Sequence, residues 1–199
     1  DNQVERIYVV VEPVAPQERI SLDPELLADV LLPGGRLAEN LSGYEERSGQ
    51  VELLRLVTKA FNVSTPAVAE AGTGTGKRFA YLLPAVQWAA QDAERVVIAT
   101  ATINLQHQLY EKDIRRVTEA LEVDVVATIV KGRGNYLCRR RIEEQKQELQ
   151  LVLEGGGADD AETLQALLQW ADTTNTGDRS DVPFPVTNQV WSQVNSEAD

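Results

Sequence analysis

A glycine-rich run that ends in lysine holds the residue types that bind phosphate. Residues 68–78 read VAEAGTGTGKR, which follows the spacing G-x-x-x-x-G-K-[ST] except for Ala71 at the first position and Arg78 at the last. In such a loop, glycines let consecutive backbone N–H groups surround phosphate oxygens, the lysine neutralises charge, and the final hydroxyl holds Mg²⁺. The predicted nucleotide contacts are Ala71, Gly72, Thr73, Gly74, Thr75, Gly76, Lys77 and Arg78, with Lys77 as the catalytic residue.

Arg78 is the unusual member of this loop, because it has no hydroxyl to offer a metal. Mg²⁺ demands near-ideal octahedral coordination by oxygen. Arginine instead donates planar, charge-assisted hydrogen bonds to phosphate. We therefore expect nucleotide binding that is largely independent of magnesium, with hydrolysis impaired. A plain Gly/Thr turn is the alternative, and the apolar segments on both sides of the loop argue against it.

The loop lies between a predicted strand and a predicted helix. Apolar runs predict strands at 67–70, 95–100 and 123–130, and helical spacing of apolar residues predicts helices at 45–61, 77–91 and 103–121. Strands that alternate with helices imply a parallel sheet with covered faces. The sequence thus predicts an α/β P-loop fold.

The two ends of the chain have a different character. Residues 5–11 resemble a strand, and Asp23-Pro24 predicts a short helix to about Leu32. After Tyr136 we expect a charged helix to about Glu154, a break at the glycines 155–157, and helices near 160–171 and 187–194. The predicted domains are a lead-in at 1–42, the first part of a nucleotide-binding domain at 43–134, and a truncated helical insertion at 135–199.

Composition limits the class of protein. The apolar fraction of 43% is globular, and no apolar run approaches the ~20 residues of a membrane-spanning helix. We expect a soluble, cytoplasmic protein without membrane contact. The chain begins with Asp1 and has no methionine, so we expect it to be part of a longer protein.

Charge is segregated along the chain. The net charge is −12, yet residues 131–141 (KGRGNYLCRRR) hold five basic residues and no acidic one. Nucleic-acid binding needs such local clusters of lysine and arginine. Two interpretations stay open, a solvated basic helix end or a surface that faces nucleic acid.

Four segments in order resemble one family, the DinG-type and XPD-like DNA helicases, which are superfamily 2 motors with an iron–sulfur cluster. The segments are YEERSGQ at 44–50, AEAGTGTGK at 69–77, ATATINLQHQL at 99–109 and KGRGNYLCRRR at 131–141, and the resemblance covers about residues 42–140. It implies a RecA-like motor domain, ATP as the nucleotide with Mg²⁺, and single-stranded DNA as the partner.

The resemblance also implies roles for single residues. Gln50 would recognise adenine, because an amide can both accept from and donate to the base; the alternative is an ordinary exposed glutamine. Thr100, Thr102, Gln106 and Arg133 would contact the DNA backbone. Thr102 alone is more typical of a helix N-cap, and we assign no catalysis to His107.

Cys138 would be the first of four ligands to a [4Fe–4S] cluster, which needs four thiolates. The chain has one cysteine, so we expect the cluster only in the full-length parent, with the other cysteines beyond Asp199. A lone cysteine is otherwise most often a small buried apolar residue.

The resemblance favours a part of an ATP-dependent DNA helicase that is inactive alone, because the sequence holds no strand ending in Asp-Glu and no second motor domain. It gives no indication of oligomeric state, and DNA binding by this part alone would be weak or absent. One alternative is a degenerate, non-hydrolysing module that binds nucleotide or DNA. A P-loop kinase or transferase is another, but it explains only the loop.

Overall fold

The structure, a computed structural model, describes residues 19–41, 43–72, 76–152 and 159–197. The chain forms two compact units, Asp1–Thr128 and Ile129–Asp199, and each is considered by itself. The predicted strand at 5–11 and the glycines 155–157 lie outside the described residues.

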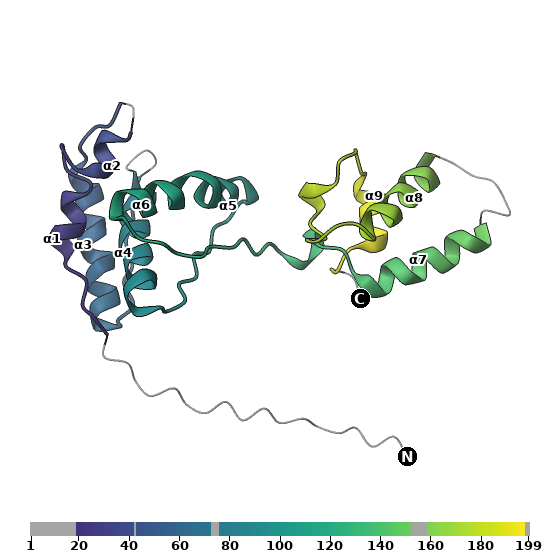
Figure 1. Cartoon of the computed structure of the whole chain (residues 1–199), viewed down its shortest axis with the longest axis horizontal. Helices are drawn as coiled ribbons and strands as arrows, with labels where there is room; N and C mark the ends of the chain where they lie inside the picture. The colour runs from purple at the N-terminus through teal and green to yellow at the C-terminus, as the bar shows by residue number, and fades with distance from the viewer. Residues whose placement is uncertain (1–18, 42, 73–75, 153–158, 198–199) are drawn as a thin grey trace, which may run out of the picture. The chain divides into compact units, whose positions relative to one another are not determined.

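The first unit is built on helices (Figure 1). Asp23 caps the first of them, because its side chain accepts from the backbone N–H groups of Glu25 and Leu26. The described elements are α1 (Pro24–Asp29), α2 (Arg36–Glu39), α3 (Ser48–Val63), α4 (Lys77–Asp92), α5 (Ile103–Gln108), the π-helical turn η1 (Leu109–Asp113) and α6 (Ile114–Leu121).

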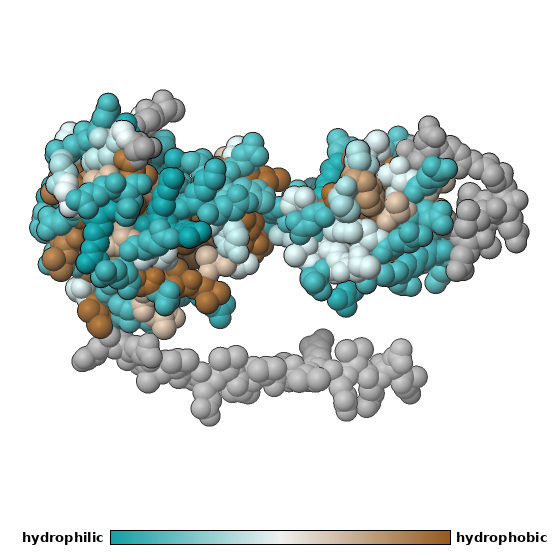
Figure 2. Space-filling view, turned by 45° about the horizontal axis from the view of Figure 1, so that its top comes forward, coloured by the Kyte–Doolittle hydropathy of each residue, from teal (hydrophilic) through white to brown (hydrophobic). Residues whose placement is uncertain are grey.

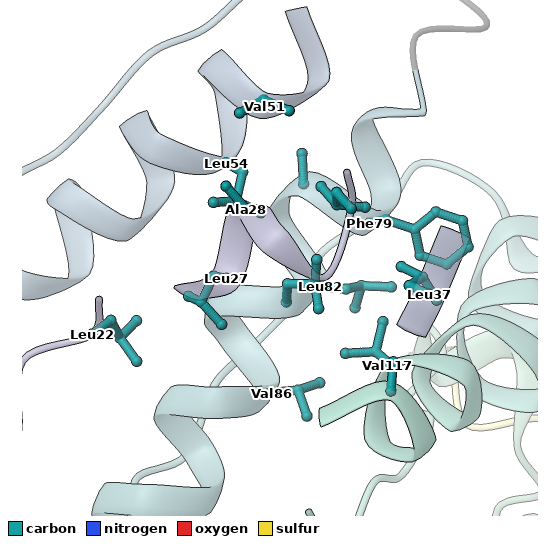
Figure 3. Packing of buried hydrophobic residues seen from close by; sticks show 14 of the residues in the cluster. Leu22, Leu27, Ala28, Leu37, Val51, Leu54, Phe79, Leu82, Val86 and Val117 are labelled. Atoms are coloured by element: carbon teal, nitrogen blue, oxygen red, sulfur yellow. The ribbon is translucent and has the colours of Figure 1, made fainter. Parts of the chain in front are cut away.

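Helices α3 and α4 lie side by side and run in the same direction. Near their N-terminal ends the side chain of Gln50 contacts Gly76, and toward their C-terminal ends the rings of Phe61 and Trp88 lie 5.4 Å apart. Buried side chains from α1, α2 and α6 join this pair in one core, and Figure 3 shows Leu27, Leu37 and Val117 of these helices near Leu82 of α4. The core thus places the start of α3 next to the start of α4.

The predicted parallel sheet is not confirmed, because the described residues contain no hydrogen-bonded strand. The segments at 95–100 and 123–130 nevertheless alternate in burial as a strand does. Val96 and Ile98 pack on the core, whereas Val97 between them is 89% exposed. Val126 is fully exposed in the same way, and Figure 2 shows hydrophobic side chains at the surface of this unit. The period-2 pattern is therefore present without a ladder of backbone hydrogen bonds.

The second unit has its own small core. Its described elements are the 3₁₀ turn η2 (Arg133–Asn135), α7 (Arg139–Val152), α8 (Asp159–Ala171), the 3₁₀ turn η3 (Arg179–Asp181) and α9 (Asn188–Val194). Leu167 and Trp191 are buried at the centre of this core. Two isolated antiparallel bridges, Tyr136 with Asp178 and Leu137 with Asn195, join its loops.

Most helices lie where the sequence predicts them, and two of the predicted helices differ in the structure. The predicted helix at 24–32 ends at Asp29, before the turn at Pro33-Gly34-Gly35, and the short α2 follows it without a prediction. The predicted helix at 103–121 is interrupted by the wider turn η1. Pro84 lies inside α4 at a buried position without ending the helix. None of the described helices is long and apolar enough to cross a membrane.

Leu82 should be central to the stability of the first unit, because its side chain is fully buried between the helices. We expect Leu82→Ala to lower the free energy of unfolding by about 2–5 kcal/mol, through lost burial and the cavity that remains. Chemical denaturation measures this. Leu26→Ala is the control, since Leu26 is 67% exposed on α1, and a similar loss in both variants would contradict the assigned core.

Candidate functional site

A hydrogen bond joins the two ends of the glycine-rich loop. Gly76 is the N-cap of α4 with φ +70°, and the ammonium of Lys77 donates back to the carbonyl of Ala71 at 3.1 Å. Helix α4 begins directly after this loop, and Gln50 brings the first turn of α3 beside it, so the positive ends of two helix dipoles lie near the loop. Of the predicted contacts, Thr73, Gly74 and Thr75 lie outside the described residues.

Gln50 of α3 is tied to the loop. Its side chain is buried, and its Nε2 donates to the carbonyl of Gly76 at 2.7 Å. A Cβ added to Gly76 would lie 2.5 Å from the same Nε2. The structure thus brings Gln50 and the loop together, although its predicted contact with adenine stays a prediction.

Arg78 points to a buried carboxylate. Its Nη1 lies 3.3 Å from Oδ2 of Asp113, whose side chain is 1% exposed. Arg116 is further away, with its Nη1 3.9 Å from Oδ1. Burial raises the pKa of Asp113, and the charges of Arg78, Arg116 and Lys112 oppose this rise. Burial also raises the pKa of the nearby Tyr81 phenol, with smaller effects of Arg78 and Asp113.

The predicted DNA contacts of the first unit surround the start of α5. The hydroxyl of Thr102 accepts from the backbone N–H of Leu105 at 3.3 Å, so Thr102 is the N-cap of this helix. The hydroxyl of Thr100 is buried without a hydrogen-bond partner. Gln106 lies in α5, and DNA contact by these three residues stays a prediction.

The basic segment 131–141 uses several of its charges inside the second unit. Lys131 is buried and its Nζ lies 2.6 Å from Oδ2 of Asp178. Arg133 donates twice to the carbonyl of Ser196, at 3.1 and 2.8 Å. Arg141 donates to the carbonyl of Ser192 at 2.9 Å. These contacts favour a structural role for most of the cluster, whereas Arg139 and Arg140 are exposed.

The Lys131–Asp178 pair is supported by further hydrogen bonds. Burial raises the pKa of Asp178, but hydrogen bonds from Lys131 and from the N–H and hydroxyl of Ser180 outweigh this effect and leave that pKa lowered. The ammonium of Lys131 also donates to Ser180 Oγ at 2.8 Å. This network joins the start of the basic segment to η3.

Cys138 is a free, half-buried cysteine at the start of α7. Its backbone N–H donates to the carbonyl of Val194. Across the described part of the chain, no group of three or more His, Cys, Asp or Glu side chains is arranged to hold a metal ion. One thiolate does not make a four-cysteine site, so this chain's own residues do not fit a [4Fe–4S] cluster.

Asp113 is the residue at this site that the sequence does not identify. Its only sequence signal is an acidic residue at a position of the predicted helix 103–121 that also faces apolar neighbours such as Leu109 and Val117. That pattern does not predict which positively charged side chain pairs with the carboxylate.

Comparison with known proteins gives a consistent family. Residues 47–164 match the model of the DEAD/DEAH box helicase family. The chain is 36% identical over 176 residues to the ATP-dependent DNA helicase YoaA of Escherichia coli, which covers 87% of this chain and 26% of that protein.

Two further relatives carry the name DinG. Identity is 37% over 199 residues with the ATP-dependent helicase DinG of Mycobacterium tuberculosis, covering 91% of this chain and 28% of that protein. It is 34% over 164 residues with the 3'-5' exonuclease DinG of Bacillus subtilis, covering 82% and 17%. The chain therefore spans about a quarter or less of the length of these relatives.

Gly76 should not tolerate a side chain. We expect Gly76→Ala to lower the free energy of unfolding by about 1–3 kcal/mol, because alanine is strained at positive φ and its Cβ would press on Gln50. Thermal denaturation measures the change. Gly49→Ala is the control, since a Cβ there meets nothing within 4 Å; equal loss in both variants would contradict the assigned contact.

Lys131 should stabilise the second unit. Removing one partner of a buried ion pair typically costs about 3–5 kcal/mol, because the other charge is left uncompensated. We therefore expect Lys131→Met to speed hydrogen exchange in peptides from 129–197, while Arg140→Met, at an exposed position, leaves exchange nearly unchanged.

The same pair predicts a pH dependence. Since the pKa of Asp178 is lowered in the folded state, its stabilising effect is present above the ordinary carboxyl value of 3.8 and is lost as the pH falls through the lowered value. In Lys131→Met, protection of the second unit from hydrogen exchange should therefore fall less than in the unmodified protein as the pH is lowered through this value. An unchanged acid profile in the variant would show that the pair does not contribute.

Proposed function

The chain belongs to the DEAD/DEAH box helicase family, and on that premise we propose that its loop at 71–78 binds ATP within an ATP-dependent DNA helicase of the DinG type. The observation that carries the proposal is the contact of Gln50 and Lys77 with opposite ends of the loop. Both are residues that the sequence predicts for the nucleotide site, and they lie in the first turns of α3 and α4.

The electrostatics of the loop support an anionic ligand. Two helix N-termini present N–H groups and partial positive charge, and Lys77 adds a full charge beside them. The hydrogen bond of Lys77 to the Ala71 carbonyl is at an exposed position. A phosphate oxygen offers the ammonium a stronger, charge-assisted partner than that carbonyl does.

Adenine recognition would require Gln50 to make further contacts. Its Nε2 is committed to Gly76, which leaves the second N–H and the carbonyl oxygen of the amide for a base. The same hydrogen bond fixes the rotamer of the amide. Gln50 would in this way both hold the loop and select adenine.

We also propose that this part of the chain forms the parallel sheet that the family implies. The three segments at 67–70, 95–100 and 123–130 would be its strands, and the side chains of Val96, Ile98, Val123 and Val125 already pack on the helical core. The exposed valines Val68, Val97 and Val126 would face the layer on the other side of the sheet. Parallel strands buried on both faces read as nearly continuous apolar runs, and residues 96–99 (VVIA) form such a run.

Single-stranded DNA is the proposed partner of Thr100, Thr102 and Gln106. A helix N-terminus with neighbouring hydroxyls can hold a phosphate without reading the base sequence. Arg133 would have to give up its hydrogen bonds to the carbonyl of Ser196 to contact the DNA backbone with its whole guanidinium. Cys138 would ligate a cluster only together with cysteines from outside this chain.

Magnesium does not enter this mechanism through residue 78, because arginine has no oxygen donor. The loop residues would bind and orient the triphosphate, and Lys77 would offset the negative charge that develops during phosphoryl transfer. The non-hydrolysing module remains the second candidate, and Arg78 is the observation that favours it.

Lys77→Ala tests the nucleotide site. We expect the variant to bind ATP at least 10-fold more weakly in a calorimetric titration, because the charge beside the phosphates is lost. Lys59→Ala is the control, since Lys59 is exposed on α3. Release of phosphate stimulated by single-stranded DNA in the full-length protein would support the helicase, whereas binding without turnover would favour the module.

A further inference from the structure

Arg78 and Asp113 join the nucleotide loop to a second functional element. Arg78 is in the first turn of α4, directly after Lys77, and Asp113 is the last residue of η1. The turn η1 continues α5, which begins next to Thr102, and leads directly into α6. A single ion pair therefore connects the loop that would hold phosphate with the helix that would hold DNA.

Asp113 is not satisfied as buried carboxylates usually are. Both of its oxygens are buried, and neither has a hydrogen-bond partner of good geometry in the described structure. The groups that face it are Arg78 from α4, Arg116 from α6 and Lys112 from η1, with the Tyr81 phenol from α4 nearby. The carboxylate is thus held mainly by attraction to nearby positive charges. Without hydrogen bonds, this attraction compensates poorly for the cost of removing the carboxylate from water.

The π-helical turn is part of this arrangement. A π turn is rare and inserts an extra residue into a helix, and such turns occur frequently at functional sites. Here it lies between α5 and α6 and ends at Asp113, whose side chain it directs inward while Tyr110 in the same turn stays exposed. The π turn therefore places the buried carboxylate of Asp113 next to Arg78.

We propose that Asp113 is a positioning residue for Arg78, and that the phosphates of a bound nucleotide compete with Asp113 for the Arg78 guanidinium. The proposal rests on the proposed nucleotide site and deepens it. Arg78 is one residue beyond Lys77, and its side chain is one third exposed, so the core does not enclose it. If it turns toward the loop, it gains bidentate, charge-assisted hydrogen bonds to phosphate, which Asp113 does not provide.

The competition links the two elements. When Arg78 turns to a phosphate, Asp113 keeps Arg116 and Lys112 as positive neighbours, and η1 loses this ion pair with α4. Nucleotide binding would in this way loosen the α5–η1–α6 segment and weaken the binding of any ligand that holds this segment against α4. That ligand would weaken nucleotide binding by the same factor, because the two effects are reciprocal.

Asp113→Asn tests the proposal in the full-length protein, with fluorescent adenosine mono-, di- and triphosphates as probes. The asparagine keeps the shape but removes the charge that competes with phosphate. We expect triphosphate binding to tighten about 3- to 10-fold and monophosphate binding to change less than 2-fold. In an Arg78→Met background, Asp113→Asn should leave triphosphate affinity unchanged.

Arg116→Met is a second variant at an exposed position, with the opposite sign. Without Arg116, Asp113 depends more on Arg78, so triphosphate affinity should fall about 2- to 3-fold. Equal effects of Asp113→Asn on all three nucleotides, or equal effects with and without Arg78, would overturn the inference and indicate a purely structural aspartate. Nucleotide binding that is absent, or unaffected by Lys77→Ala, would overturn the proposed function instead, and this inference with it.

Discussion

The packing of α3 against α4 is the constraint on which the candidate site depends. Buried leucines along the pair, with Leu54 on α3 and Leu82 on α4, hold the helices parallel. Because they are parallel, their N-terminal ends meet, and Gln50 reaches the carbonyl of Gly76. An antiparallel pair would place a negative helix end beside the loop and would separate Gln50 from it. Apolar burial thus determines where the polar contacts form.

The sequence predicts the helices well and the sheet less well, for a physical reason. Helical periodicity is local, and α3, α4 and α9 begin and end within a few residues of their predicted bounds. A strand needs a partner that is distant in sequence, and its apolar pattern says only that it can be buried. The segment 95–100 has that pattern and one packed face, yet backbone pairing does not follow from the pattern.

In the candidate site, too, the sequence predicts the residues that act through local sequence and misses those that depend on distant contacts. The loop spacing predicts Lys77 as a phosphate contact, because phosphate-binding loops use consecutive residues, whereas Gln50 is predicted only from the resemblance to DinG-type helicases. The structure brings both side chains to the loop. The basic cluster at 131–141 is a poorer guide to a surface, since Lys131 and Arg141 meet partners about 50 residues away. Charge patterns do not show which cations are used internally. The sequence does not identify Asp113 for the same reason, because its role depends on a contact with Arg78 that only the fold creates.

Lys77 and Arg78 show how one helix start can serve two purposes. Successive residues on a helix point about 100° apart, so the lysine turns back over the loop to Ala71 while the arginine turns toward η1. A hydroxyl at position 78 would be too short to reach Asp113 and would leave that carboxylate with Arg116 and Lys112 as its positive neighbours. The arginine that removes a metal ligand therefore also supplies the buried charge with its nearest cation. The departure from the usual loop sequence and the buried aspartate are best understood as one arrangement.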